Sequence, residues 1–536
     1  MTALRNSLLV PLALVALSGR DADARVDLTR VAKEAGTAVT NAAIRRVQET
    51  CIFDNDFQFV RRIAWAQTEF GQNEGTFEDG RYGGMYAITR ADFERTKNPA
   101  NYERGEYRRL VSRIKRQLGL DYDSFTYTGG ATLKPLHAAL ITRMFWKSLD
   151  KGRGDLPRTI RVQGAIWKTD FRGAASLSVR HFIDSANSIP EFCKSGGADV
   201  LFVLDVSNSI GSSNFEKLRQ FLKKVVSSFS MGPNSYRFAI DKFSAIAVHS
   251  VGFREYGDSP AELQRRIDGV RYDQGRYTNT HLALEMAARE SFSKERGARD
   301  PRLGYARIVV VFTDGDSESA QKTARAARAA RQEGLVLFAV GVGDINPSEL
   351  ESIASEPRCL RKYELRDFED LSQSFGEDLK AQTCKTPALV PQTQPEIETL
   401  LYEEQMLFYE IQANVSTGVR FTVDMKSGST VVYMSQLIRA PDEVTYDFKF
   451  EASVSTGGDL TVSGEELEAQ RSSSAEAPSS DLTPVYVSIQ GKETENLFKL
   501  TTLTGPNFVK KGASVVHAAA TFVAFAVLVS TAALHF

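Results

Sequence analysis

Between residues 197 and 384 the sequence alternates apolar runs with amphipathic stretches of helical period. The runs Val200–Val206, Ile308–Phe312 and Leu335–Val342 are almost continuously apolar, as strands buried on both faces are. The first run is followed by Phe215–Phe229, whose apolar side chains fall on one face of a helix. Strands that alternate with helices predict an open, mostly parallel sheet covered by helices on both faces, a doubly wound α/β fold of the Rossmann-like kind.

Weaker patterns complete this predicted domain. Residues 238–243 and 245–251 have the composition of two further strands. Helical periodicity is present at about residues 318–333, 347–355 and 366–382, so we expect three more helices there.

Two carboxylates and three hydroxyls follow the predicted strands. Asp205, Ser207 and Ser209 come after the first strand, Asp314 follows another, and Thr278 lies in a loop that opens a helix. Ligands of such sheets bind beyond the carboxyl ends of the strands, and hard cations such as Mg²⁺ prefer oxygen ligands. The pattern therefore predicts a Mg²⁺ site, with Mn²⁺ as the alternative ion. A run of Asp and Ser residues is also typical of a plain helix cap, but three pieces in this order favour the metal.

The charge of the predicted site bears on its use. Two carboxylates just neutralise a divalent ion, and hydroxyl ligands add no charge. A metal held in this way still attracts a carboxylate from outside, whereas a third protein carboxylate would weaken that attraction. We therefore expect a partner protein or matrix ligand that bears an exposed Asp or Glu.

The central region resembles the von Willebrand factor A family, which includes integrin ligand-binding domains, matrilins and collagen-associated proteins. The resemblance implies that the metal-ion-dependent adhesion site of the family is carried by Asp205, Ser207, Ser209, Thr278 and Asp314. It implies coordination by the three hydroxyls, with both carboxylates acting largely through water. Asn208, Tyr277 and Asp316 would lie on the rim of the site. The segments that carry the resemblance are Asp199–Ser209, Gly275–Thr280, Val310–Gly315, Phe338–Gly343 and Ile353–Pro357.

The four cysteines predict two disulfide bonds. Cys51, Cys193, Cys359 and Cys384 show no paired spacing for zinc, and three connectivities are open. Cys193 and Cys384 flank the domain at 193–384, whose ends the resemblance brings close together, so we expect a bridge between them that tethers the last helix. The alternative is a bridge between Cys384 and Cys359, which leaves Cys51 to pair with Cys193 or stay free.

Both ends of the chain predict export to the cell surface. Residues 1–24 combine Arg5, an apolar stretch and small residues, as a signal peptide does. Residues 512–536 are apolar and small and follow two lysines, which resembles a GPI-attachment signal with Gly512 as the attachment residue. A retained single membrane span is the alternative. The sequon at Asn414 is a candidate glycosylation site.

The N-terminal region is expected to be mainly helical, with a helical segment at residues 25–58 and a module at 59–180. This module faintly resembles lysozyme-like transglycosylases, whose catalytic glutamate protonates the leaving oxygen. The matching position holds Gln67, and Glu69 lies two residues further along, about 200° around a helix. We therefore expect no enzymatic activity, and at most glycan binding.

The C-terminal region is predicted to be a β-sandwich. Residues 398–506 alternate apolar and polar side chains in short runs, and the proline-containing segment 385–397 is expected to be a linker. Within the sandwich region, residues 465–484 have the composition of an exposed loop. With 66 Lys and Arg against 67 Asp and Glu, the chain has no basic excess for nucleic-acid binding.

These features together predict a multidomain adhesion or recognition protein outside the cell. One alternative is a secreted glycan-cleaving enzyme that its central domain directs to a target. Another is a structural matrix component that does not use its metal site.

Overall fold

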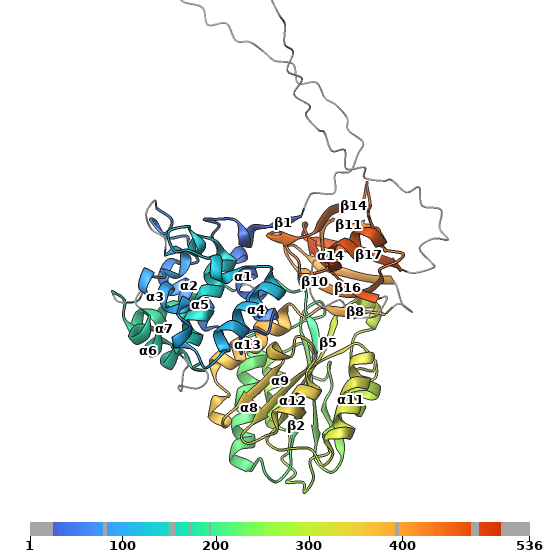
Figure 1. Cartoon of the computed structure of the whole chain (residues 1–536). Helices are drawn as coiled ribbons and strands as arrows, with labels where there is room; N and C mark the ends of the chain where they lie inside the picture. Colours follow the sequence, from blue (N-terminus) through green and yellow to red (C-terminus); the bar gives the residue numbers. More distant parts are fainter. Residues whose placement is uncertain are drawn as a thin grey trace, which may run out of the picture.

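The computed structural model describes residues 25–504, apart from 79–82, 150–155, 172, 173, 175, 192, 193, 392–395 and 473–481. The described chain forms a helical N-terminal module, a central α/β domain and a C-terminal module of strands (Figure 1). The predicted signal peptide at 1–24 and attachment segment at 512–536, with Gly512, lie outside these residues, as does Cys193. No helix within the described part is at once long and apolar enough to cross a bilayer.

The central domain is built on a six-stranded sheet in the order β4-β3-β2-β5-β6-β7. All neighbours are parallel except β4, which pairs antiparallel with β3. Strands β2, β5 and β6 are almost wholly buried, which is why their sequences are so continuously apolar. The strands are β2 (Ala198–Asp205), β3 (Arg237–Phe243), β4 (Ala247–Val251), β5 (Ala306–Thr313), β6 (Leu335–Val342) and β7 (Lys362–Leu365).

Helices cover both faces of this sheet, which confirms the predicted doubly wound architecture. One core contains α8 (Ser212–Ser227), α9 (Pro260–Asp268) and α13 (Gln373–Cys384). The opposite core contains α10 (Thr280–Met286), α11 (Ala320–Gln332) and α12 (Pro347–Ile353). The helix expected at 366–382 starts later, at Gln373, because β7 and a short turn precede it.

The N-terminal module is mainly helical, and all its helices share one core. Residues 25–58 are therefore not a separate segment, since α1 packs its Ala43, Ile44 and Val47 into that core. The module also extends past residue 180, because Phe182 of α7 is buried in it. The helices are α1 (Thr37–Glu49), α2 (Phe59–Thr68), α3 (Arg90–Lys97), α4 (Glu106–Leu118), α5 (Pro135–Leu149), α6 (Ile160–Asp170) and α7 (Val179–Ser188).

The two residues weighed in the lysozyme-like resemblance, Gln67 and Glu69, lie at the end of α2. Gln67 is on the last turn of the helix, and Glu69 is exposed directly after it in a left-handed conformation. The side chain of Glu69 is therefore in contact with solvent. The likeness of this module to lysozyme-like proteins stays a prediction.

The C-terminal module consists of two sheets whose inward side chains join in one core, in agreement with the predicted β-sandwich. Their orders are β14-β12-β16-β10-β8 and β15-β11-β17-β9. The strands are β8 (Ala388–Val390), β9 (Glu396–Tyr402), β10 (Met406–Asn414), β11 (Val419–Ser427), β12 (Ser429–Ser435), β14 (Phe448–Ser453), β15 (Gly458–Val462), β16 (Leu482–Gly491) and β17 (Glu495–Thr504).

Two predictions for this region are wrong. The segment 385–397 is not a free linker, because β8 pairs in parallel with β10 and β9 begins at Glu396. The loop predicted at 465–484 includes helix α14 (Gly464–Ser472), whose Leu467 is buried in the core. The sequon residue Asn414 ends β10 and is half-buried, and its side-chain oxygen accepts hydrogen bonds from Ser416.

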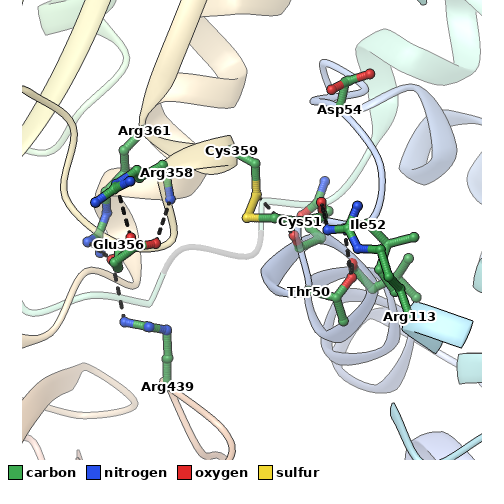
Figure 2. The surroundings of a disulfide bond; sticks show 12 residues. Thr50, Cys51, Ile52, Asp54, Arg113, Glu356, Arg358, Cys359, Arg361 and Arg439 are labelled. Carbon is green, nitrogen blue, oxygen red and sulfur yellow. Dashed lines mark hydrogen bonds and ion pairs between the residues drawn. A yellow bond between two sulfur atoms is a disulfide. The ribbon is translucent and has the colours of Figure 1, made fainter. Parts of the chain in front are cut away.

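The three modules are joined by covalent and polar contacts. Cys51, after α1, forms a disulfide with Cys359 of the central domain (Figure 2). This bond excludes the alternative pairing of Cys359 with Cys384. Cys384 is itself disulfide-bonded, and the bridge between Cys193 and Cys384 stays a prediction because Cys193 lies outside the described residues. Close to the observed disulfide, Arg439 of the C-terminal module donates to the carbonyl of Glu356.

Both flanking modules lie near the amino ends of the central strands or beside α13. Gly196, before β2, donates its N–H to Met406 of β10, and Gly304, before β5, is in close contact with Tyr409. In the N-terminal part, β1 (Val26–Asp27) pairs with β13 (Thr445–Tyr446). The carboxyl ends of the central strands therefore face away from both modules, at the bottom of Figure 1.

Candidate metal centre

The loop after β2 carries the first group of predicted ligands. Asp205 ends β2 and is fully buried, and its Oδ1 accepts the N–H of Ser207 at 2.8 Å. Thr313, at the end of the neighbouring β5, donates its hydroxyl to Oδ2 of Asp205 at 2.7 Å. These two bonds fix the carboxylate where two parallel strands end side by side, the edge at which such sheets bind ligands.

A chain of hydrogen bonds joins the other residues of this edge. The Ser207 and Ser209 hydroxyl oxygens are 3.0 Å apart, and Ser209 donates to Oδ1 of Asp314 at 2.8 Å. Ser207 is buried, Asp314 half-buried and Ser209 exposed. Four of the five predicted side chains are therefore gathered into one hydrogen-bonded group.

The loop with Thr278 is held against the same edge. Gly275 donates its N–H to Val206 and accepts the N–H of Asn208, so the two loops run together. A side chain at Gly275 would place its Cβ 2.0 Å from the Ser244 hydroxyl, so only glycine permits this approach. Thr278 is 9% exposed, accepts the Glu318 N–H with its carbonyl, and its hydroxyl makes no hydrogen bond to any residue that the structure describes.

The electrostatics of the centre favour a bound cation. Burial raises the pKa of Asp205 to about 6, although hydrogen bonds from Ser207 and Thr313 oppose the increase. Burial also raises the pKa of Asp314. Each carboxylate is thus less stable in its charged form than it would be in water. A divalent cation between them would remove this cost.

The donor set suits a hard divalent ion. It offers two carboxylates and three hydroxyls, all oxygen ligands of the kind that Mg²⁺ prefers. Across the described parts of the chain, no group of three or more His, Cys, Asp and Glu is placed to hold a metal ion. Within the described residues, no third carboxylate therefore joins these two to neutralise the remaining positive charge of a bound ion.

The rim of the centre combines polar and apolar side chains. Tyr277 is 52% exposed and Ile246, in the turn between β3 and β4, is 65% exposed. The turn contacts the Thr278 loop, because Asn279 donates to the carbonyls of Ser244 and Ala245. Asn208 is exposed as well, whereas Asp316, also predicted on the rim, uses its carboxylate to accept the N–H of Asn346.

The sequence did not predict the roles of two residues that position the site. The Tyr272 hydroxyl donates to the carbonyl of Ser207 and accepts the N–H of Gly211, both at 2.8 Å. These two hydrogen bonds hold the loop after β2 in place. Thr313 orients Asp205 as described. Thr313 directly precedes Asp314 in the segment Val310–Gly315, so its role could have been recognised from the sequence. Nothing in the sequence around Tyr272 indicates that it positions the site.

The hairpin formed by β3 and β4 contains an ion pair between half-buried His249 and buried Asp241. Nδ1 of His249 lies 2.9 Å from Oδ1 of Asp241, whose Oδ2 accepts the Ser291 hydroxyl, and Nε2 faces Glu290 at 3.7 Å. The hydrogen bond to Asp241 raises the pKa of His249, although burial and the charge of Arg296 oppose it.

We expect a pH-dependent loss of stability when His249 is replaced by Gln. The charged imidazole stabilises the fold fully below the unfolded pKa of about 6.5, and this contribution disappears as the pH rises through the raised folded value. Urea unfolding should show a deficit on the order of 1 kcal/mol for the variant at pH 5.5 and a smaller one at pH 8.5. An equal deficit at both pH values would contradict the ion pair.

Comparison with known proteins identifies the central domain. Residues 199–377 match the family model of the von Willebrand factor type A domain. The chain is 35% identical to matrilin-4 of Mus musculus over 192 residues, 36% of this chain and 30% of matrilin-4. It is 32% identical to the transmembrane cell adhesion receptor mua-3 of Caenorhabditis elegans over 197 residues, 36% of this chain and 5% of the receptor. The chain thus spans less than a third of these relatives, and residues 199–377 are a von Willebrand factor type A domain.

Among solved structures, proximal thread matrix protein 1 from the mussel byssus is similar to part of the chain. The identity is 28% and the TM-score 0.32, with 40% of this chain and 53% of that one covered.

Proposed function

We propose that the von Willebrand factor type A domain of this chain binds an extracellular protein or matrix ligand through a divalent cation at its exposed strand edge. The cation is Mg²⁺, with Mn²⁺ as the alternative. Asp205, Ser207, Ser209, Thr278 and Asp314 hold it, and an Asp or Glu of the partner completes its ligands. The chain is an adhesion or recognition protein rather than an enzyme.

One observation carries this proposal. The Ser207, Ser209 and Asp314 side chains form a hydrogen-bonded group beside buried Asp205, at an edge that faces away from both flanking modules. Each of the two carboxylates has a raised pKa, and the described residues place no third carboxylate with them. A cation in this group would keep enough positive charge to bind a carboxylate from outside, and the edge leaves space for a macromolecule.

The setting of the domain supports a place outside the cell. The disulfide between Cys51 and Cys359 is typical of an oxidising compartment. The names of the relatives include a transmembrane cell adhesion receptor. We propose attachment at the cell surface through the segment 512–536, by a lipid at Gly512 or as a membrane span, with Asn414 as a glycosylation site.

The proposal predicts cation-dependent capture of a partner through its carboxylates. The purified chain, immobilised on a sensor surface, should bind components of an extracellular-matrix extract in Mg²⁺ and release them in EDTA. Conversion of the carboxylates of the extract to amides should abolish the binding, because the ion then has no acid group to bind.

Two variants make this experiment decisive. Asp205→Ala should abolish capture in Mg²⁺. The matched control is Asp300→Ala, which removes an exposed aspartate at the opposite edge of the sheet and should leave capture unchanged. Equal capture in Mg²⁺ and EDTA, or full capture by Asp205→Ala, would exclude the proposed function.

A further inference from the structure

A cavity of about 350 Å³ lies in the N-terminal module, away from the metal centre. It is bounded by α4, α5, α6 and the loop that follows Cys51. Small-molecule sites typically measure roughly 300–1,000 Å³ and are mostly apolar with a few polar groups. The apolar lining matches this description and includes Phe53, Leu110, Trp146, Leu149, Leu156 and Ile166.

Cationic side chains gather along one side of this cavity. Arg109 and Arg113 lie one turn apart on α4, and neither has a carboxylate partner among the residues described. Arg113 donates to the carbonyl of Cys51 at 2.6 Å and lies beside the loop that carries the disulfide (Figure 2). In contrast, Lys147 pairs with Glu106 at 3.2 Å, so those two charges cancel.

Two buried donors that line the cavity have no acceptor. Nη1 of Arg143 and Nε1 of Trp146 make no hydrogen bond to the described residues, although the two side chains are only 6% and 3% exposed. Arg143 forms an ion pair with Asp56, but the 3.6 Å between Nη1 and Oδ2 is beyond hydrogen-bond distance. Buried donors without acceptors are costly, and an acceptor brought in by a ligand would remove this cost.

We propose that this cavity binds a small amphipathic carboxylate. The apolar body of the ligand packs against Trp146, Leu110 and Ile166. Its carboxylate accepts hydrogen bonds from Arg143 and Arg113. Arg109 and Arg113 are the cations of the lining without a carboxylate partner among the described residues, so the site favours a negative charge on the ligand. This site does not depend on the metal centre or on the function proposed for it.

Titration calorimetry of the full chain with decanoate tests the proposal. We expect saturable binding of one molecule per chain. Decanol should bind at least tenfold more weakly because it lacks the charge, and decyltrimethylammonium should not bind. Equal binding of all three compounds would show simple apolar partition and overturn the proposal, as would the absence of saturable binding of decanoate.

Three variants locate the site. Arg113→Gln should weaken decanoate about tenfold by removing one charge-assisted bond. Ile166→Trp should abolish binding by filling the cavity from a half-buried position, with the melting temperature preserved. Arg108→Gln, on the exposed side of α4, should change nothing. Unchanged affinity in Ile166→Trp would place decanoate elsewhere and overturn the proposal.

Discussion

Replacement of Asp205 by Asn should strongly weaken Mg²⁺ binding and leave the central domain folded. The carboxylate is fully buried between the ends of β2 and β5, and it carries half of the negative charge offered to the ion. Its loss should weaken Mg²⁺ and Mn²⁺ by at least about a hundredfold, the effect of removing on the order of 3 kcal/mol of charge interaction. Electron paramagnetic resonance of Mn²⁺ measures this directly.

The same variant should be as stable as the native chain, or more stable, once the metal is removed. The oxygen of Asn can still accept the Ser207 N–H, and its amide can donate to the Thr313 hydroxyl, which already lies 3.1 Å from the Gly315 carbonyl. A pKa raised from 3.8 to about 6 means that charged Asp205 costs the metal-free fold on the order of 3 kcal/mol at neutral pH.

The sign of the pH dependence distinguishes this cost from a general loss of packing. A raised folded pKa destabilises the metal-free native chain above pH 6, and the penalty disappears as the pH falls from 6 towards 3.8. In EDTA at pH 7.5, the Asp205→Asn variant should therefore have a higher free energy of unfolding than the native chain. Most of this difference should disappear near pH 4.5.

At pH 7.5, Mg²⁺ should stabilise the native chain more than the Asp205→Asn variant. An ion at a hundred times its dissociation constant stabilises the native chain by roughly 2.7 kcal/mol, and a site weakened a hundredfold stabilises the variant by only about 0.4 kcal/mol. Asp300→Asn, an exposed control, should respond to Mg²⁺ like the native chain. An Asp205→Asn variant that Mg²⁺ stabilises as much as the native chain would place the ion elsewhere.

The sequence was most informative where local pattern and burial coincide. Strands β2, β5 and β6 were predictable because a parallel strand covered on both faces must be apolar along its length. The five candidate ligands could be named because they directly follow such strands or lie where a helix opens, and their role as metal ligands stays a prediction. In contrast, β7 has four residues, two of them the charged Lys362 and Glu364, so its pattern is too short to recognise.

Long-range contacts were not predictable in this way. The disulfide between Cys51 and Cys359 spans 308 residues, and the spacing of four cysteines does not select among connectivities. The same holds for β1, whose Val26 pairs with Tyr446 in another module, and for Tyr272 at the metal loop. These contacts depend on how helices and strands that lie far apart in the sequence pack together. The periodicity of apolar residues along the chain carries no information about that packing.

The second large effect is expected at Asp378 of α13, where the N-terminal module meets the central domain. Its buried carboxylate accepts hydrogen bonds from Asn55 and Gln58 of that module, both at 2.7 Å, and from Tyr363 at 2.9 Å. Asp378→Ala leaves the buried donors of Gln58 and Tyr363, and the half-buried donor of Asn55, without this acceptor. We expect a loss of roughly 1–3 kcal/mol at this interface, the cost of leaving neutral buried donors without an acceptor.

The loss should appear as uncoupling of the two modules rather than as their separation. Arg62 still pairs with Glu377 and Arg158 with Asp370, and the Cys51–Cys359 disulfide keeps the modules attached. Calorimetry should therefore show two melting transitions where the native chain shows one. Gln373→Ala, an exposed change on the same helix, should keep a single transition.

Hydrogen exchange can show where the coupling is lost. In Asp378→Ala, amides of α13 and of the loop before α2 should exchange faster, because both sides of the broken contact open locally. Strands β2 and β5 are held by the parallel sheet and should keep their protection. Because Phe375 of α13 stacks on Phe221 of α8, the helix that follows the metal loop, faster exchange should extend to α8 before it reaches the sheet. Unchanged exchange in α13 would mean that Asp378 does not hold the modules together, and the polar contacts of Arg62 and Arg158 would then have to carry the interface.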